Sequence, residues 1–99
     1  MGFFKIIKDM VTSEKVDYSE KIKQGAAIID VRTAGEFNSG HAKGSLNIPL
    51  NNLSSKISNY TGKEVIVVCK SGMRSAQAKQ LFERQGVSCY NAGAWQNLN

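Results

Sequence analysis

The chain lacks the marks of several protein classes. It has two cysteines, one histidine and one proline in 99 residues, and no long apolar run. Cys69 and Cys89 are separated by nineteen intervening residues, without a CxxC pair or a Cys/His cluster, which argues against a disulfide scaffold and a zinc site. The first ten residues, MGFFKIIKDM, show neither a signal-peptide cleavage site nor a membrane span. We therefore expect free thiols in a reducing, cytoplasmic setting.

The composition is that of one ordinary globular domain spanning residues 1–99. Hydrophobic residues make up 41% and charged residues 21%, and the formal net charge is +5. A positive charge suits a small anionic ligand or an acidic protein surface. The basic residues are scattered and no nucleic-acid-binding motif accompanies them, so we expect no nucleic acid partner. We expect a monomer.

Apolar residues near the N-terminus recur at helical spacing. Phe3, Ile6, Ile7 and Met10 occupy positions i, i+3, i+4 and i+7, which predicts an amphipathic helix over residues 1–12. The spacing favours a helix that packs against the domain. The alternative is an arm that binds a membrane surface or a partner.

Strand-like and helix-like segments alternate along the rest of the chain. The strand-like runs are 26–31, 46–49, 65–68 and 87–90, and the helical segments are 18–24, 50–60 and 76–85. This alternation predicts an α/β fold with a mainly parallel central sheet of about five short strands, flanked by helices on both faces. In such sheets ligands bind beyond the carboxyl ends of the strands, where Cys69 lies.

The segment that follows the most strand-like run, residues 69–75, has the sequence CKSGMRS. A thiol reacts as the thiolate, and a helix N-terminus together with cations lowers its pKa from about 8.5. Lys70 and Arg74 supply cations beside Cys69. An inert buried cysteine is the alternative, but it would not require a glycine, two cations and two hydroxyls in the next six positions. We therefore expect Cys69 to be catalytic.

The rest of this segment is suited to binding negative charge. Gly72 lets the chain curl so that successive N–H groups converge on one point. Ser75 is predicted to cap the following helix with its hydroxyl. Such a ring of donors would hold an anion or a sulfur-substituted cysteine. The predicted binding residues are Lys70, Ser71, Gly72, Met73, Arg74 and Ser75.

Two motifs together resemble the rhodanese-type sulfurtransferases. Residues 69–75 are similar to that family's active-site loop, C-x-x-G-x-R followed by Ser or Thr. Residues 28–50, IIDVRTAGEFNSGHAKGSLNIPL, are similar to its other signature, and the two motifs cover residues 26 to about 86. The positions matching that second signature are Asp30, Val31, Arg32, Glu36, Phe37, Gly40, His41, Gly44, Ser45, Asn47, Ile48 and Pro49.

The resemblance implies transfer of sulfane sulfur without a metal or an organic cofactor. The Cys69 thiolate would take sulfur from a donor such as thiosulfate, hold it as a persulfide and pass it to cyanide, a thiol or a protein. One alternative is a non-catalytic module or a persulfide carrier that serves a protein partner. A phosphatase or arsenate reductase is disfavoured, because related phosphatases have five residues between Cys and Arg, whereas this chain has four.

Four further residues are predicted to have supporting roles. By resemblance, Asp30 at the end of its strand braces the cysteine loop. Arg32 and Glu36 are four apart, which predicts a salt bridge between them. The place of His41 in the family motif suggests a structural hydrogen bond, with a general base as the alternative.

The end of the chain departs from the family pattern. A Gly-Gly pair and a later tryptophan are usual, but this chain reads Ala92-Gly93-Ala94-Trp95 and ends at Asn99, so we expect a short final helix or none. Cys89 is interpreted as a packed core residue, and a thiol that resolves an oxidised Cys69 is the alternative.

Overall fold

The computed structural model describes residues 16–98, so the helix predicted over residues 1–12 lies outside the described part of the chain. Its core is a parallel sheet in the order β2-β1-β3-β4. The strands are β1 (Ala27–Asp30), β2 (Leu46–Asn47), β3 (Glu64–Cys69) and β4 (Ser88–Ala94). The α/β class and the parallel sheet are confirmed, with four strands in residues 16–98 where about five were expected.

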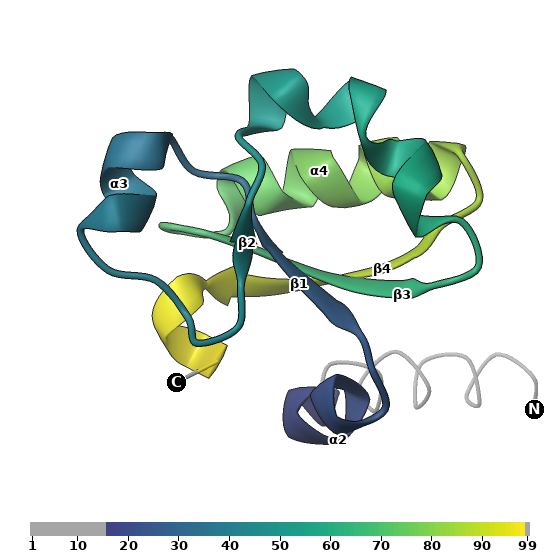
Figure 1. The fold of residues 1–99 in the computed structure, drawn as a ribbon, viewed down its shortest axis with the longest axis horizontal. Coiled ribbons are helices and arrows are strands. Elements are labelled where there is room, and N and C mark those ends of the chain that lie inside the picture. The colour runs from purple at the N-terminus through teal and green to yellow at the C-terminus, as the bar shows by residue number, and fades with distance from the viewer. Residues whose placement is uncertain (1–15, 99) are drawn as a thin grey trace, which may run out of the picture.

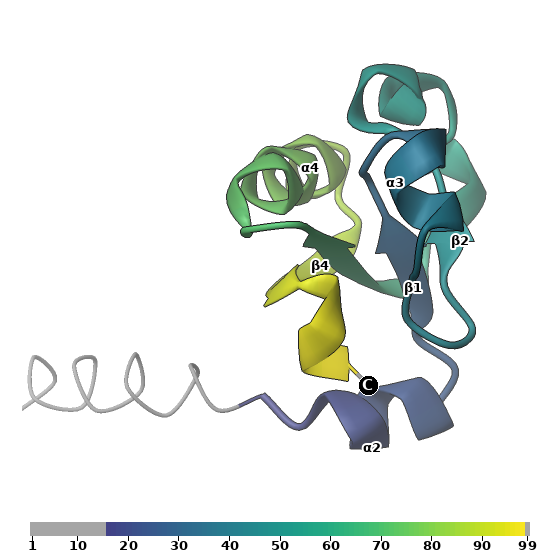
Figure 2. The same ribbon diagram turned by 90° about the vertical axis from the view of Figure 1, so that its left-hand side faces the viewer.

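Helical segments cover both faces of the sheet, as predicted. Helix α4 and the two 3-10 helices between β2 and β3 lie on one face, and helix α2 with the C-terminal 3-10 turn lies on the other (Figures 1 and 2). The segments are α2 (Tyr18–Lys23), α3 (Ala34–Asn38), η1 (Leu50–Ser55), η2 (Ile57–Tyr60), α4 (Met73–Arg84) and η3 (Trp95–Leu98).

Strand β3 is apolar on both sides because it lies between two covered faces. Val65 and Val67 pack with Cys69 in the cluster under α4, η1 and η2. Ile66 and Val68 point the other way, toward α2 and η3. The alternation places the Cys69 side chain on the α4 side of the sheet, where the loop that leads into α4 can close over it.

The single helix predicted over residues 50–60 is wrong. The segment forms two short 3-10 helices, although Leu53 and Ile57 are buried as the pattern required. Asn and Ser side chains compete with the backbone for hydrogen bonds and so weaken an α-helix. Here the Ser55 hydroxyl donates to the Asn52 carbonyl at 3.2 Å. The final strand is longer than expected, and the final helix is the single turn η3.

We predict that Phe82→Ala costs about 3–5 kcal/mol of the free energy of unfolding, because it opens a cavity in the core. Phe82 has no exposed surface and meets the edge of the Tyr60 ring at a centroid distance of 5.9 Å. Urea unfolding measures the loss. Leu46→Ala is the control: its side chain is 54% exposed, so we expect a change within about 0.5 kcal/mol. Equal losses for the two variants would contradict this packing.

Candidate active site

Cys69 is the last residue of β3, a central strand of the sheet, and its side chain has no exposed surface. The loop after it folds back over the sulfur. The Gly72 N–H donates to Sγ at 3.0 Å, the Ser75 N–H lies 3.4 Å from Sγ, and the Ser75 hydroxyl oxygen also lies at 3.4 Å. We call residues 69–75 the sulfur cradle, because polar hydrogens converge there on one sulfur atom.

The cradle depends on the backbone of Gly72. Its φ of 101° lies in the left-handed region, which glycine adopts without strain, and a Cβ there would lie 3.4 Å from the Gly93 Cα. Gly72 itself occupies the N-cap position, so α4 begins at Met73. The prediction that Ser75 caps the helix is therefore wrong. Ser75 is a buried residue in the first turn, with its N–H and hydroxyl beside the sulfur.

Two opposed effects act on the pKa of the Cys69 thiol. Burial raises it, but hydrogen bonds from the Ser75 hydroxyl and from the amides of Ser75, Gly72 and Ser71 together hold the pKa below its ordinary value. The sequence pattern predicts this lowering of the pKa from a helix N-terminus together with the cations Lys70 and Arg74. The structure assigns it first to the hydrogen bonds, while Lys70 is exposed and the Arg74 charge interacts with Cys69 more weakly than with Glu36.

The Arg74 guanidinium forms a two-pronged ion pair with Glu36, at 2.8 and 3.1 Å. This pairing lowers the pKa of Glu36 to about 2. The predicted Arg32–Glu36 salt bridge is therefore wrong. A capping box with Thr33 holds the Glu36 carboxylate at the start of α3, where Arg74 reaches it. The ion pair fastens α3 to the first turn of α4.

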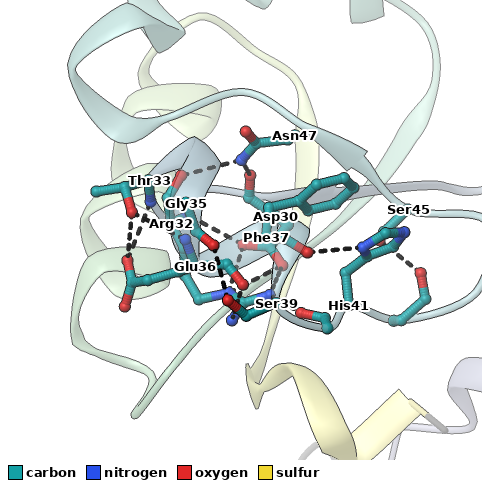
Figure 3. Close-up of polar contacts among 12 residues, drawn as sticks. Asp30, Arg32, Thr33, Gly35, Glu36, Phe37, Ser39, His41, Ser45 and Asn47 are labelled. Carbon is teal, nitrogen blue, oxygen red and sulfur yellow. Dashed lines mark hydrogen bonds and ion pairs between the residues drawn. The ribbon is translucent and has the colours of Figure 1, made fainter.

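Arg32 pairs with Asp30 instead, at 2.7 Å, and both residues are buried (Figure 3). The Arg32 guanidinium also donates to the carbonyls of Gly40 and Glu36, and it lies 5.0 Å from the centre of the Trp95 ring. All hydrogen bonds of the Asp30 carboxylate within residues 16–98 go to Arg32. The Asp30 carboxylate makes no hydrogen bond to the cradle within the described residues, so the predicted bracing role would act through Arg32 and α3.

His41 is exposed and belongs to the loop after α3. Its Nδ1 lies 2.8 Å from the Phe37 carbonyl, and its ring stacks on the Phe37 ring at a centroid distance of 3.7 Å (Figure 3). A carbonyl can only accept, so Nδ1 carries the proton. Both of these contacts of His41 are with Phe37 of α3, and neither reaches the cradle.

Asn91 belongs to the site, and the sequence analysis missed it. Its Oδ1 accepts from the Ser75 hydroxyl at 2.6 Å and from the Gly93 N–H at 2.9 Å, and its Nδ2 donates to the Gly72 carbonyl at 3.1 Å. The ladder between β3 and β4 is irregular here, between Val67 and Val68. Asn91 follows directly after the predicted strand 87–90, and its sequence neighbours carry no signal of this role.

Cys89 lies far from the cradle. It pairs with Val65, four residues before Cys69 on β3, which places it about 13 Å along the strand. Burial raises the pKa of its thiol to about 12. The structure therefore favours a packed core cysteine over a resolving thiol.

The described residues contain neither a metal-binding cluster nor a membrane-spanning helix. No group of three His, Cys, Asp or Glu side chains in residues 16–98 could hold a metal ion. None of the described helices is long and apolar enough to cross a membrane.

Comparison with known proteins agrees with this architecture. The family model for the rhodanese-like domain matches residues 14–97. The chain is 39% identical over 62 residues to protein YqhL of Bacillus subtilis, covering 62% of this chain and 49% of YqhL, so it spans about half the length of that relative. It is 31% identical over 74 residues to the thiosulfate sulfurtransferase PspE of Escherichia coli, covering 71% of each chain.

A solved structure described as a rhodanese with anions from E. coli superposes with a TM-score of 0.69 at 30% identity, covering 74% of this chain and 91% of that one. A parallel sheet whose central strand ends in a cysteine held by a curled loop defines a class of α/β domains. With the family match over residues 14–97, the chain belongs to the rhodanese-like domain family.

We predict that Cys69 forms a thiolate at a pH where an ordinary thiol, with a pKa of about 8.5, is still protonated. The amides that point at Sγ favour the charged form, so the lowered pKa makes the thiolate fraction rise early as pH increases. Thiolate absorbance in the ultraviolet, followed against pH in the Cys89→Ser variant, measures it. The double variant Cys69→Ser/Cys89→Ser gives the baseline. A midpoint at or above the free-thiol value would contradict the assignment.

Proposed function

We propose that the protein is a sulfurtransferase that moves a sulfane sulfur from a donor such as thiosulfate to a thiophilic acceptor through a persulfide on Cys69. The observation that carries this proposal is the convergence of the Gly72 N–H, the Ser75 N–H and the Ser75 hydroxyl on one buried sulfur atom. The two amide donors are fixed by the backbone and stabilise negative charge on sulfur without reorganisation during the reaction.

The proposed cycle has two displacements at sulfur. The Cys69 thiolate attacks the outer sulfur of thiosulfate, a new S–S bond forms, and the old S–S bond breaks as sulfite leaves with the electron pair. In the second displacement cyanide or a thiolate attacks the outer sulfur of the persulfide. The Cys69 thiolate then leaves with the electron pair, and the cradle donors receive its charge. No outside oxidant or reductant is needed.

The position of Arg74 argues against phosphate chemistry. Cys-dependent phosphatases need a cationic donor on the phosphate oxygens. Here both terminal nitrogens of Arg74 bind Glu36, and the four residues between Cys69 and Arg74 curl around a single sulfur. Phosphatase or arsenate reductase activity is therefore the weaker alternative.

The outer side of the cradle suits an anionic donor and a thiophilic acceptor. Lys70 and Ser71 are exposed there, and the positive charge of Lys70 attracts an anion such as thiosulfate. PspE, a thiosulfate sulfurtransferase, and the E. coli rhodanese with anions support this choice by similarity. Met73, a residue of the cradle, is 74% exposed, which favours a protein acceptor as a second candidate. If the acceptor is a protein, the domain would be a persulfide carrier.

We predict that thiosulfate adds one sulfur, about 32 Da, to the peptide that contains Cys69. Intact mass and peptide mapping measure the addition, and thiocyanate formation from cyanide measures turnover. Cys69→Ser should abolish both. Cys89→Ser is the matched control and should keep most of the activity, because its thiol is buried with a pKa of about 12. Sulfur found on Cys89, or no addition from any sulfane donor, would overturn the proposal.

A further inference from the structure

The Ser75 hydroxyl has one proton and two neighbours that could receive it. The Asn91 Oδ1 lies at 2.6 Å and the Cys69 Sγ at 3.4 Å. A hydroxyl donates once and accepts with its lone pairs. Ser75 can therefore donate to Asn91 or to the sulfur, but not fully to both.

Backbone contacts fix the orientation of the Asn91 side chain. The Gly93 N–H, which can only donate, lies 2.9 Å from Oδ1. The Gly72 carbonyl, which can only accept, lies 3.1 Å from Nδ2. The amide oxygen must therefore face Ser75, and the Ser75 hydroxyl donates to it. In this arrangement Ser75 Oγ offers only a lone pair to the sulfur, which suits a protonated thiol rather than a thiolate.

We propose that Asn91 is a positioning residue that holds the Ser75 proton away from Cys69 while the sulfur is a thiol and gives it up when the sulfur becomes charged. On thiolate formation the hydroxyl turns from Oδ1 to Sγ, and Oδ1 keeps its bond to the Gly93 N–H. Asn91 thereby limits how strongly Ser75 stabilises the thiolate. The inference rests on the proposed function only for its catalytic meaning, since the hydrogen-bond geometry exists without it.

This limit has a chemical use in sulfur transfer. The nucleophilicity of a thiolate falls as its pKa falls, so the most effective attacking thiol has a pKa near the ambient pH. The amide donors of Gly72 and Ser75 act on the sulfur permanently. Because Asn91 competes for the Ser75 proton, the hydroxyl stabilises the Cys69 thiolate less, and the thiolate stays more nucleophilic.

Charged and titratable groups near the cradle come from several elements. The nearest part of β4, residues 91–94, has none, so replacing Asn91 by an uncharged residue leaves the local charge unchanged. The groups on the surrounding elements are Tyr18 of α2, which donates to the Asn91 carbonyl, the Asp30–Arg32 pair after β1, the Glu36–Arg74 pair of α3 and α4, and the exposed Lys70.

A double-mutant cycle tests the proposal, with thiolate absorbance followed against pH in the Cys89→Ser background. Asn91→Ala frees the hydroxyl for the sulfur, so about two pH units below the parent midpoint, where the thiolate fraction is small, we expect that fraction to rise about three- to tenfold. Ser75→Ala should lower that fraction. In the Ser75→Ala background, Asn91→Ala should change it less than about twofold, because Asn91 acts through the hydroxyl.

Asn97→Ala is the matched control. The Asn97 Nδ2 donates to the Ala92 carbonyl at 2.7 Å, so this variant also removes an amide bond to β4 but leaves Ser75 alone. Asn97→Ala should leave the midpoint of the Cys69 thiolate titration unchanged. A fall in the thiolate fraction for Asn91→Ala, or an equal rise with and without the Ser75 hydroxyl, would overturn the proposal.

Asn91→Asp keeps the acceptor and covers the case in which Asn91→Ala does not fold. A carboxylate is a stronger acceptor, so the thiolate fraction should fall, and it should fall less when Ser75 is Ala, where only the added charge acts. Equal falls in the two backgrounds would overturn the proposal. No sulfur donor enters this titration, so failure of sulfur transfer from thiosulfate would leave its result interpretable.

Discussion

The hydrogen bond from the Gly72 N–H to the Cys69 sulfur, at 3.0 Å, is the contact on which the site depends. This hydrogen bond forms because the backbone of Gly72 adopts the left-handed conformation, which turns the chain back over the end of β3. A sulfur with no exposed surface would otherwise favour the neutral thiol. Charge at this buried position is tolerable only because fixed dipoles replace water around it.

Residues from β4, from α3 and from the end of β1 hold that turn in place. Parallel strands bring the ends of β1, β3 and β4 to one edge of the sheet, so residues distant in sequence can brace the same loop. Asn91 binds the Gly72 carbonyl, and Glu36 binds Arg74. Both side chains of the Glu36–Arg74 pair are about a third exposed, so solvent screens it, and its main effect is orientation rather than stability. The buried Asp30–Arg32 pair orders the loop that carries α3.

Local patterns predicted the class of fold and the position of the cysteine loop. The β-branched run over residues 65–68 is apolar on both sides, which predicts a covered strand, and a glycine three residues after Cys69 marks the turn. The hydrogen-bond partners of individual side chains were harder to predict. Glu36 has Arg32 at helical spacing, yet its carboxylate binds Arg74, which is 38 residues away and reachable only through the sheet. Asn91 was missed for the same reason, since nothing within its own strand indicates a bond to Ser75.

The most direct measurement of the central claim follows the backbone amide protons of the cradle by nuclear magnetic resonance as pH is raised. If amides hold the negative charge of the sulfur, the Ser71, Gly72 and Ser75 N–H signals should move downfield together, with one midpoint equal to that of Cys69 thiolate absorbance. Amides of the distant residues Ser88 and Cys89 on β4 should stay still. Cradle amides that do not respond while the thiolate forms would contradict the account.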